Sequence, residues 1–262
     1  MNELRADVAI IGGSGFYEML DDSRDLVCDV VIDTPFGTPA APITIGTIGV
    51  RRVAFLPRHG RNHKFAAHRV PYRANIAALA SLGVGAVFAP CSVGSLQPDI
   101  HPGEFVVIDQ LVDRTWGRAD TFHDAGGPSG DPGTDVPVHH QSFADPYDAG
   151  LRAALVTAGR AKGVAMHDGG TMVVINGPRF STRAESVWFR SMGWHVVNMT
   201  GCPEAVLAAE AGLKYATIAL VTDYDAGVDG HEPVTMDQVF ATLRSNIAAV
   251  RNVLSAAIAL LA

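Results

Sequence analysis

Cysteine is scarce in this chain of 262 residues. Its three cysteines, Cys28, Cys91 and Cys202, lie far apart and include no C-x-x-C pair. An odd and dispersed set of cysteines argues against a disulfide framework and against a cysteine-built zinc site. We therefore expect a cytoplasmic protein whose thiols stay reduced.

Long apolar runs and an excess of positive charge are missing too. No uninterrupted apolar stretch is long enough to span a bilayer, and the initial MNELRADVAIIGG carries charges on both sides of a very short apolar run. The formal net charge of −7 argues against a general attraction to nucleic acid or to an anionic membrane. These absences predict a soluble, unexported protein with neither of those partners, so any anion site must be local.

The chain also lacks internal repeats and any shift in composition that would mark a linker, so we expect residues 1–262 to form a single domain. Short β-type runs alternate with helical patterns at residues 72–82, 146–161, 182–192, 203–212 and 235–261. This alternation predicts an α/β fold with a central mixed, twisted β-sheet flanked by helices. Residues 124–137, dense in Gly, Pro and Asp, predict either a mobile lid or an intersubunit contact.

The first strand runs into a glycine-rich turn, Gly12-Gly13-Ser14-Gly15. A dinucleotide-binding turn needs a third glycine where this chain has Glu18, and no Gly-Lys-Ser/Thr of a P-loop follows. The backbone N–H groups and the Ser14 hydroxyl nevertheless suit a single phosphate or sulfate. A plain strand-to-helix turn is an equally good interpretation of these residues alone.

A basic cluster follows another strand. RRVAFLP leads directly into RHGRNHKF, residues 58–65, where five of eight positions are Arg, His or Lys. In an acidic protein, such a cluster is what a phosphate pocket needs, although a solvated loop explains Arg61, His63 and Lys64 equally well. A third strand end, in APCSVGSL at residues 89–96, again combines small, hydroxyl and glycine residues, so three strand ends could converge on one ligand.

Together these stretches resemble the trimeric nucleoside phosphorylases, and within them the S-methyl-5′-thioadenosine phosphorylases. The similarity lies in IIGGSGFYE, DTPFGTPAAPITIG, RHGRNHKFAAHRVPYRANIAAL, VGSLQPDIHPGEFVVIDQLVDRT, INGPRFSTRAES, VVNMTGCPEAVLAAEAGL and ATIALVTDYDAG, in the family's order from residue 8 to about 227. The resemblance implies the nucleoside phosphorylase fold and a salvage reaction. Inorganic phosphate, a co-substrate, attacks the anomeric carbon and releases purine and a sugar 1-phosphate, with no metal or redox cofactor.

For phosphate, the family pattern falls on Ser14, Arg58, His59, Cys91, Ser92 and Thr200. Arg58 would supply a charged fork, and Ser14 and Thr200 would supply hydroxyl donors. Cys91-Ser92 departs from the Thr-Ala that is usual in thioadenosine members. Because a thiol is a weak donor, we expect an altered phosphate affinity unless the Ser92 hydroxyl compensates, and a small buried filler is the other interpretation of Cys91.

For the sugar and the base, the resemblance implies contacts by Asn198, Met199, Phe180 and Ser181. Met199 would pack under the ribose, and Phe180 would stack on the purine with Ser181 at its rim. The wall around the 5′ group falls on apolar residues, Met236, Val239 and Phe240, which favours a methylthio group over a hydroxyl.

The stretch TDYDAG indicates the identity of the base. A carboxylic acid held at purine N7 assists the departure of the base, and a carboxylate can accept from an amino group at position 6. Relatives that act on 6-oxopurines tend to have Asn here, whereas this chain has Asp223 and Asp225. We expect a 6-aminopurine substrate, with Asp223 as the N7 acid and Asp225 assisting, and the pKa of Asp223 raised by burial and by Asp225.

His140 matches a histidine that the family contributes from the neighbouring subunit, which implies a homotrimer in which each site needs two chains. Without the resemblance, His140 is one of an exposed pair in a loop.

Three alternatives stay open. One is a phosphorylase of the same fold that prefers adenosine, inosine, guanosine or methylthioinosine to methylthioadenosine. Another is hydrolysis by water, against which the Arg58-His59 pair favours phosphate as nucleophile. The third is a non-catalytic nucleotide-binding or scaffold protein that uses the glycine-rich turn.

Overall fold

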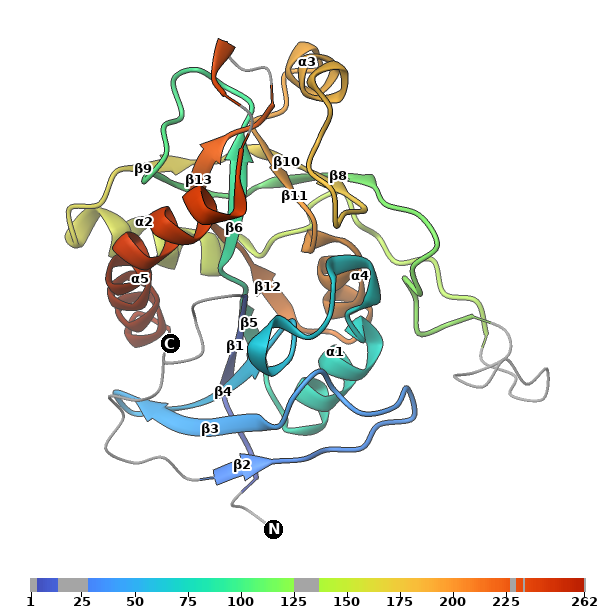
Figure 1. Ribbon diagram of the computed structural model, residues 1–262. Helices are drawn as coiled ribbons and strands as arrows, with labels where there is room; N and C mark the ends of the chain where they lie inside the picture. Colours follow the sequence, from blue (N-terminus) through green and yellow to red (C-terminus); the bar gives the residue numbers. More distant parts are fainter. Residues whose placement is uncertain (1–3, 14–27, 125–136, 227–229, 233, 262) are drawn as a thin grey trace.

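The computed structural model describes residues 4–13, 28–124, 137–226, 230–232 and 234–261 (Figure 1). Every helical pattern of the sequence is present as an α-helix: α1 (Tyr72–Ser81), α2 (Ala149–Ala161), α3 (Arg183–Ser191), α4 (Gly201–Glu210) and α5 (Met236–Ala259). In this described part of the chain, none of the helices is both long and apolar enough to cross a membrane. Most of the Gly-rich segment 124–137, whose role the sequence left open, falls outside the described residues.

The strands form two mixed sheets, where the sequence predicted one. The first has the order β12 (Lys214–Ala216), β5 (Ala86–Phe88), β1 (Val8–Gly12), β4 (Arg51–Pro57), β3 (Ile43–Ile48), β2 (Cys28–Val30). The second has the order β8 (Gln110–Arg114), β10 (Thr171–Ile175), β11 (Val196–Asn198), β6 (Cys91–Ser95), β13 (Ile218–Tyr224), β7 (Phe105–Val107), β9 (Met166–Asp168). Both contain parallel and antiparallel pairs, so the predicted mixed α/β architecture is confirmed.

Strand β1 explains why helices cover both faces of the first sheet. Alternate residues of a strand point to opposite faces. Val8 and Ile10 belong to a buried cluster with α2 and α5, whereas Ala9 and Ile11 belong to a second cluster with α1 and α4. Figure 1 shows these two helix pairs on opposite sides of β1, β5 and β12. A strand buried on both faces must be apolar throughout, as VAIIG is.

The stretch APCSVGSL differs from its prediction. The sequence indicated one strand followed by a loop of small residues, but β5 ends at Phe88 and a new strand, β6, begins at Cys91 in the other sheet. Cys91 and Ser92 therefore lie where the chain passes between the sheets. β6 pairs with β13 and β11, and these long-range partners stabilise a strand that the local composition does not indicate.

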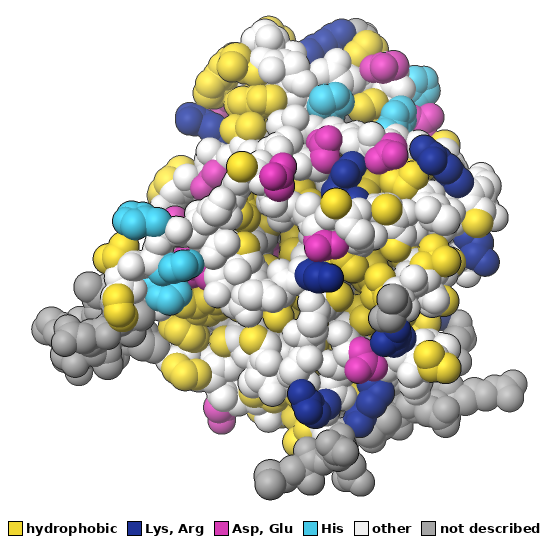
Figure 2. All heavy atoms as spheres, turned by 180° about the vertical axis from the view of Figure 1, so that it is seen from behind, with side chains coloured by type: hydrophobic (Ala, Val, Ile, Leu, Met, Phe, Trp, Pro, Cys, Tyr) yellow, Lys and Arg dark blue, Asp and Glu magenta, His cyan; other side chains and the backbone are white. Residues whose placement is uncertain are grey.

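The exterior carries mixed charge. On the face shown in Figure 2, Lys and Arg side chains are interspersed with Asp and Glu rather than gathered in a patch of one sign. Such a face offers no stripe of basic side chains to a polyanion.

A buried ion pair joins the end of β4 to α4. Arg58 Nε donates to Glu204 Oε2 at 2.7 Å and Arg58 Nη2 donates to Glu204 Oε1 at 2.8 Å, with both side chains almost fully buried. The Tyr215 hydroxyl donates to Glu204 Oε1 at 2.8 Å. Burial acts to lower the pKa of Arg58, but Glu204 outweighs burial and holds that pKa above its ordinary value. The guanidinium therefore stays charged inside the protein.

We predict that Glu204→Gln lowers the free energy of unfolding by about 3–5 kcal/mol, because it leaves the Arg58 charge buried without its counterion. Urea unfolding followed by circular dichroism measures this loss. The control is Asp29→Asn, which breaks the exposed Arg61–Asp29 pair and is expected to cost less than about 1 kcal/mol. Equal losses in the two variants would contradict the assigned role of the buried pair.

Candidate active site

A cavity of about 490 Å³ opens between the carboxyl ends of several strands and the start of α5. It brings together residues that the sequence analysis singled out from far-apart segments: Arg58, His59, Cys91, Ser92, Phe180, Ser181, Asn198, Met199, Thr200, Asp223, Asp225, Met236, Val239 and Phe240. Ser14 lies outside the described residues. His140 is exposed and does not line the cavity of this single chain.

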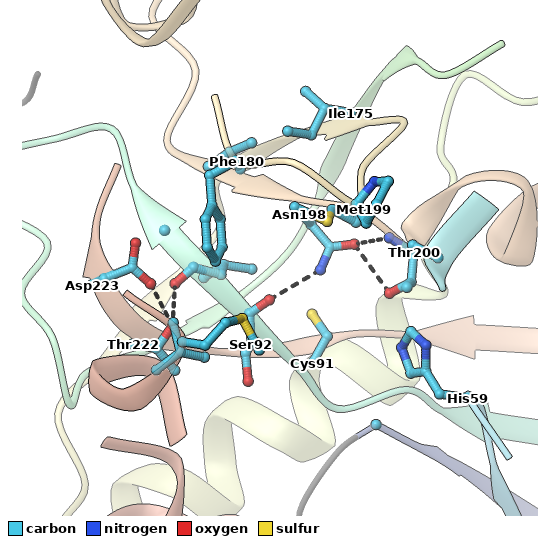
Figure 3. Close-up of a pocket in the computed structure, with 18 of the residues that line it drawn as sticks. His59, Cys91, Ser92, Ile175, Phe180, Asn198, Met199, Thr200, Thr222 and Asp223 are labelled. Carbon is cyan, nitrogen blue, oxygen red and sulfur yellow. Dashed lines mark hydrogen bonds between the residues drawn. The ribbon is translucent and has the colours of Figure 1, made fainter. Parts of the chain in front are cut away.

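Figure 3 shows that the cavity has two chemically different ends. His59, Cys91 and Thr200 lie at one end, and Thr222 and Asp223 lie at the other, with Phe180 beside them. The first end contains the donors and the guanidinium that suit an anion, and the second contains carboxyl groups.

The fork of Arg58 is not free for an anion, contrary to the sequence-based expectation. Besides its bonds to Glu204, Arg58 donates from Nη2 to Ile11 O at 3.0 Å and from Nη1 to Pro90 O at 3.2 Å. Of the five N–H groups of an arginine, one on Nη1 is left without an acceptor among the described residues. A Cβ on Gly13 would lie 3.4 Å from Nη1, so the glycine-rich turn approaches this atom closely.

His59 is an uncharged acceptor. Its Nδ1 lies 2.8 Å from the carbonyl oxygen of Phe65, so Nδ1 carries the proton and donates. Burial, and then the charge of Arg58, lowers the pKa of His59 to about 4. At neutral pH, Nε2 therefore has a free lone pair, and His59 adds no positive charge. Its ring stacks on His63 with the centroids 4.2 Å apart.

Asn198 organises the backbone at the anion end. Its Nδ2 donates to Ser92 O at 3.1 Å, and its Oδ1 accepts from the backbone N–H groups of Thr200 at 2.6 Å and Gly201 at 2.8 Å. The side chain thus fixes the end of β11 against β6 and against the first turn of α4. Asn198 therefore positions its neighbours, and since it lines the cavity and its NH2 group has two N–H donors, the second stays available for the contact with the nucleoside that the resemblance implied.

Cys91 lies at the anion end as a neutral thiol. The side chain is buried, and burial raises its pKa to about 12. Because the thiolate is the nucleophilic form, this cysteine is unreactive, and it offers an anion only a weak S–H donor.

A bulge in β13 shapes the carboxyl end. The register with β6 shifts between Val221 and Asp223, so the strict alternation of side chains is interrupted here. Thr222 and Asp223 are consecutive, yet both line the cavity, and the Thr222 hydroxyl donates to Asp223 Oδ1 at 2.7 Å. A regular strand would point one of these two side chains away.

Both carboxyl groups at this end have pKa values raised above the ordinary value of an aspartate. Burial, with a further contribution from Asp225, raises the pKa of Asp223 to about 6, which is the direction that the sequence predicted. Burial also raises the pKa of Asp225, although the hydroxyls of Ser181 and Ser186 oppose this. These two hydroxyls lie near the Asp225 carboxyl but form no hydrogen bond of good geometry with it, so Asp225 Oδ2, Ser181 Oγ and Ser186 Oγ keep hydrogen-bonding capacity that a ligand could use.

The position of Gly177 determines how the segment that contains Phe180 packs against Met199. This residue has φ +62°, and a Cβ on it would lie 2.6 Å from Met199 Sδ. The chain after β10 can therefore approach Met199 only because position 177 has no side chain. Phe180 follows in the same segment and faces the cavity (Figure 3).

The start of α5 closes the remaining wall. A capping box begins this helix, in which Thr235 Oγ1 accepts from the backbone N–H of Gln238. Val239, Phe240 and Leu243 then line the cavity with apolar surface. Leu243 was not predicted, although its spacing of three and four residues from Phe240 and Val239 places it on the same helix face. The sequence analysis also missed Ile175 and Thr222, for which the sequence contains no comparable signal.

The fold and the cavity define an α/β protein with an anion end and a carboxyl end in one site. The chain belongs to the phosphorylase superfamily, whose family model matches residues 7–259. It is 56% identical to the S-methyl-5′-thioadenosine phosphorylase of Mycobacterium tuberculosis, over 96% of this chain and 88% of that protein.

Two further relatives bear on the site. The purine nucleoside phosphorylase of Streptomyces coelicolor is 49% identical over 99% of this chain and 91% of that protein. Among solved structures, the methylthioadenosine phosphorylase of Schistosoma mansoni in complex with adenine is similar with a TM-score of 0.90 and 38% identity, covering 98% of this chain and 92% of that one.

We predict that Asp223→Asn changes the pH dependence of stability. A carboxyl whose pKa is raised from 3.8 to about 6 stabilises the fold at low pH, and this contribution is lost as pH rises through 6. Relative to wild type, Asp223→Asn should therefore gain about 2 kcal/mol in free energy of unfolding between about pH 4 and pH 8.

Urea titrations at the two pH values measure this difference. The exposed Asp237→Asn on the first turn of α5 serves as the control and should show no such gain. A constant difference between wild type and Asp223→Asn at both pH values would contradict a raised pKa.

Proposed function

We propose that this protein catalyses the phosphorolysis of S-methyl-5′-thioadenosine to adenine and 5-methylthioribose 1-phosphate. The observation that carries the proposal is the arrangement of the cavity: an anion end around Arg58 and Thr200, and a carboxyl end where the pKa of Asp223 is raised to about 6. The relatives named methylthioadenosine phosphorylase support this choice of substrate.

At the anion end, phosphate would sit beneath the sugar and attack the anomeric carbon. The remaining N–H of Arg58 Nη1 would bind one of its oxygens, and Ser14 of the glycine-rich turn would add a hydroxyl. The Thr200 hydroxyl would turn from Asn198 Oδ1, to which it donates at 3.3 Å, to bind another oxygen. His59 Nε2, an acceptor, would take a hydrogen bond from the P–OH of hydrogen phosphate. The Arg58 fork itself is occupied by Glu204, so neutral donors would do much of the binding.

At the carboxyl end, the glycosidic bond breaks as the sugar develops oxocarbenium character and negative charge builds on the purine. Asp223 in its protonated form would donate its proton to N7, so adenine leaves neutral and Asp223 becomes a carboxylate. Asp225 would accept from the amino group at position 6, and the unpartnered Ser181 hydroxyl lies beside it. A pKa of about 6 suits this proton transfer, because both protonation states are accessible near neutral pH.

Between the ends, Phe180 would stack on the purine and Met199 would pack under the ribose, held by the Asn198 network. The 5′-methylthio group would contact the apolar start of α5, through Met236, Val239 and Phe240. A 5′-hydroxyl would find no polar partner on these three side chains, which favours the methylthio substrate.

We also propose the finer features that the resemblance implies. The protein would be a cytoplasmic homotrimer in which His140 of one chain completes the site of its neighbour, and residues 1–262 would form one domain. Its partners would be phosphate and nucleoside alone, without metal or redox cofactor, in purine and methionine salvage. The exposed position of His140 in the single chain is compatible with a contact to another copy, and sedimentation equilibrium tests the trimer.

A second candidate is a purine nucleoside phosphorylase that prefers adenosine, inosine, guanosine or methylthioinosine. The 49% identity to the Streptomyces coelicolor enzyme of that name supports it. The Asp223–Asp225 pair and the apolar wall of α5 favour a 6-aminopurine with an apolar 5′ group.

The deciding experiment is an assay of purine release from methylthioadenosine, adenosine and inosine, with and without phosphate. We expect phosphate-dependent release that is fastest from methylthioadenosine and is lowered about 100-fold or more in kcat by Asp223→Asn, as for loss of a general acid. Release without phosphate would indicate hydrolysis, preference for inosine would favour the second candidate, and no release would point to a binding protein.

We predict that Cys91→Thr lowers the KM for phosphate by about threefold to tenfold, because a hydroxyl donates a stronger hydrogen bond than a thiol. Initial rates at saturating nucleoside measure this effect. The matched control is Cys91→Ala, which has no donor and should keep the KM at or above the wild-type value. Equal KM values in all three proteins would make Cys91 a small buried filler.

A further inference from the structure

Arg118 lies outside the cavity but holds the ends of the segments that form one of its walls. We propose that Arg118 is a positioning residue for the nucleoside, acting through the backbone of Ile175, Asn176 and Met199. The proposal rests on the proposed function, since it assigns a role in binding the nucleoside of that reaction.

The hydrogen bonds of Arg118 converge on three segments. Nη2 donates to the carbonyl oxygens of Asn176 and Met199, each at 2.9 Å, and to that of Ile175 at 3.5 Å. Nη1 donates to the carbonyl of Cys202 in the first turn of α4. Nε donates to Asn176 Oδ1 at 3.3 Å. One guanidinium thus joins the residues that follow β10, the residues that follow β11, and α4.

Two of these carbonyls, those of Asn176 and Met199, lie just beyond the last residues of their strands. β10 ends at Ile175 and β11 ends at Asn198, and beyond those residues the ladder no longer fixes the backbone. The side chains of Ile175 and Met199 both line the cavity, as Phe180 does (Figure 3). The hydrogen bonds from Arg118 fix the backbone of these residues where the strands no longer do so.

The shape of the side chain suits this task. A guanidinium is planar and carries five donors in a rigid arrangement, whereas a lysine presents three donors at a single point. Arg118 is half-buried, its guanidinium lies over the ring of Tyr72 at 5.6 Å, and no carboxylate among the described residues forms an ion pair with it. Its charge is therefore directed to backbone carbonyls.

The phosphate end has its own support. The N–H groups of Thr200 and Gly201 are held by Asn198, which forms no hydrogen bond with Arg118 among the described residues. The Met199 carbonyl and the Thr200 N–H belong to one peptide group, but the bonds from Asn198 stay in place without Arg118. Loss of Arg118 should therefore disturb the nucleoside wall more than the anion end, and this difference separates positioning from general stability.

The test compares Arg118→Lys and Arg118→Ala with the matched pair Arg152→Lys and Arg152→Ala. Arg152 is also half-buried and also donates to a backbone carbonyl, that of Ile108 at 3.0 Å, but it lies on α2 away from the cavity. We expect the Arg118 variants to raise the KM for methylthioadenosine about tenfold or more, as for a misplaced binding group, and the KM for phosphate less than about threefold. The Arg152 variants should leave both KM values near wild type.

Chemical rescue gives a second readout. Millimolar guanidinium chloride should lower the raised nucleoside KM of Arg118→Ala, because the ion can occupy the place of the missing side chain, and should leave Arg152→Ala unchanged. If Arg118→Ala does not fold, Arg118→Lys carries the KM comparison.

If the wild type is active and the Arg118 variants keep its KM for the nucleoside, the assigned role of Arg118 is wrong, but the proposed function stands. Equal effects in the Arg152 variants, or failure of Arg118→Lys to fold when Arg152→Lys folds, would also overturn the inference. A wild type that releases no purine would overturn the proposed function together with it.

Discussion

The buried ion pair between Arg58 and Glu204 is the interaction on which the site depends. Arg58 follows β4, donates to the backbone of β1 and of the passage between the two sheets, and pairs with a glutamate of α4. The pair fixes these segments relative to one another and uses most of the guanidinium's donors. A charge in the interior needs a partner. Glu204 therefore stabilises the fold by pairing with Arg58, and the same pairing leaves little positive charge to attract an anion.

Burial sets the protonation of both ends of the cavity. It lowers the pKa of His59 and raises those of Cys91 and Asp223, so each pKa moves in the direction of the neutral form, and for Asp223 both forms are accessible near neutral pH. An anion entering this cavity meets directed hydrogen bonds and little net charge. Such a site selects ligands by the positions of their donors and acceptors more than by charge alone. A leaving group that develops negative charge in it must be neutralised by proton transfer.

The sequence predicted the helices well, although only α3 and α5 begin with capping boxes and α1 and α4 have no side-chain cap. It missed β6, since Cys91, Ser92 and Gly94 have no strong strand preference and their pairing partners lie far away in the chain. It placed nearly all candidate residues in one cavity, largely through the family resemblance. It could not show that Glu204, 146 residues from Arg58, occupies the Arg58 fork, nor that Asn198 bonds inward, because these contacts depend on tertiary structure.

The bulge in β13 lets one strand both pair within the sheet and direct two consecutive side chains into the cavity. β13 pairs with β6 before the bulge up to Val221 and again after it from Asp223, while the side chains of Thr222 and Asp223 both line the cavity. Under the proposed function, substitutions at these positions would alter base selectivity without shifting the register that holds the sheet together. Within one lineage of enzymes, preference for one purine over another could therefore diverge by a few local replacements, and a protein engineer could alter the same positions while leaving the core intact.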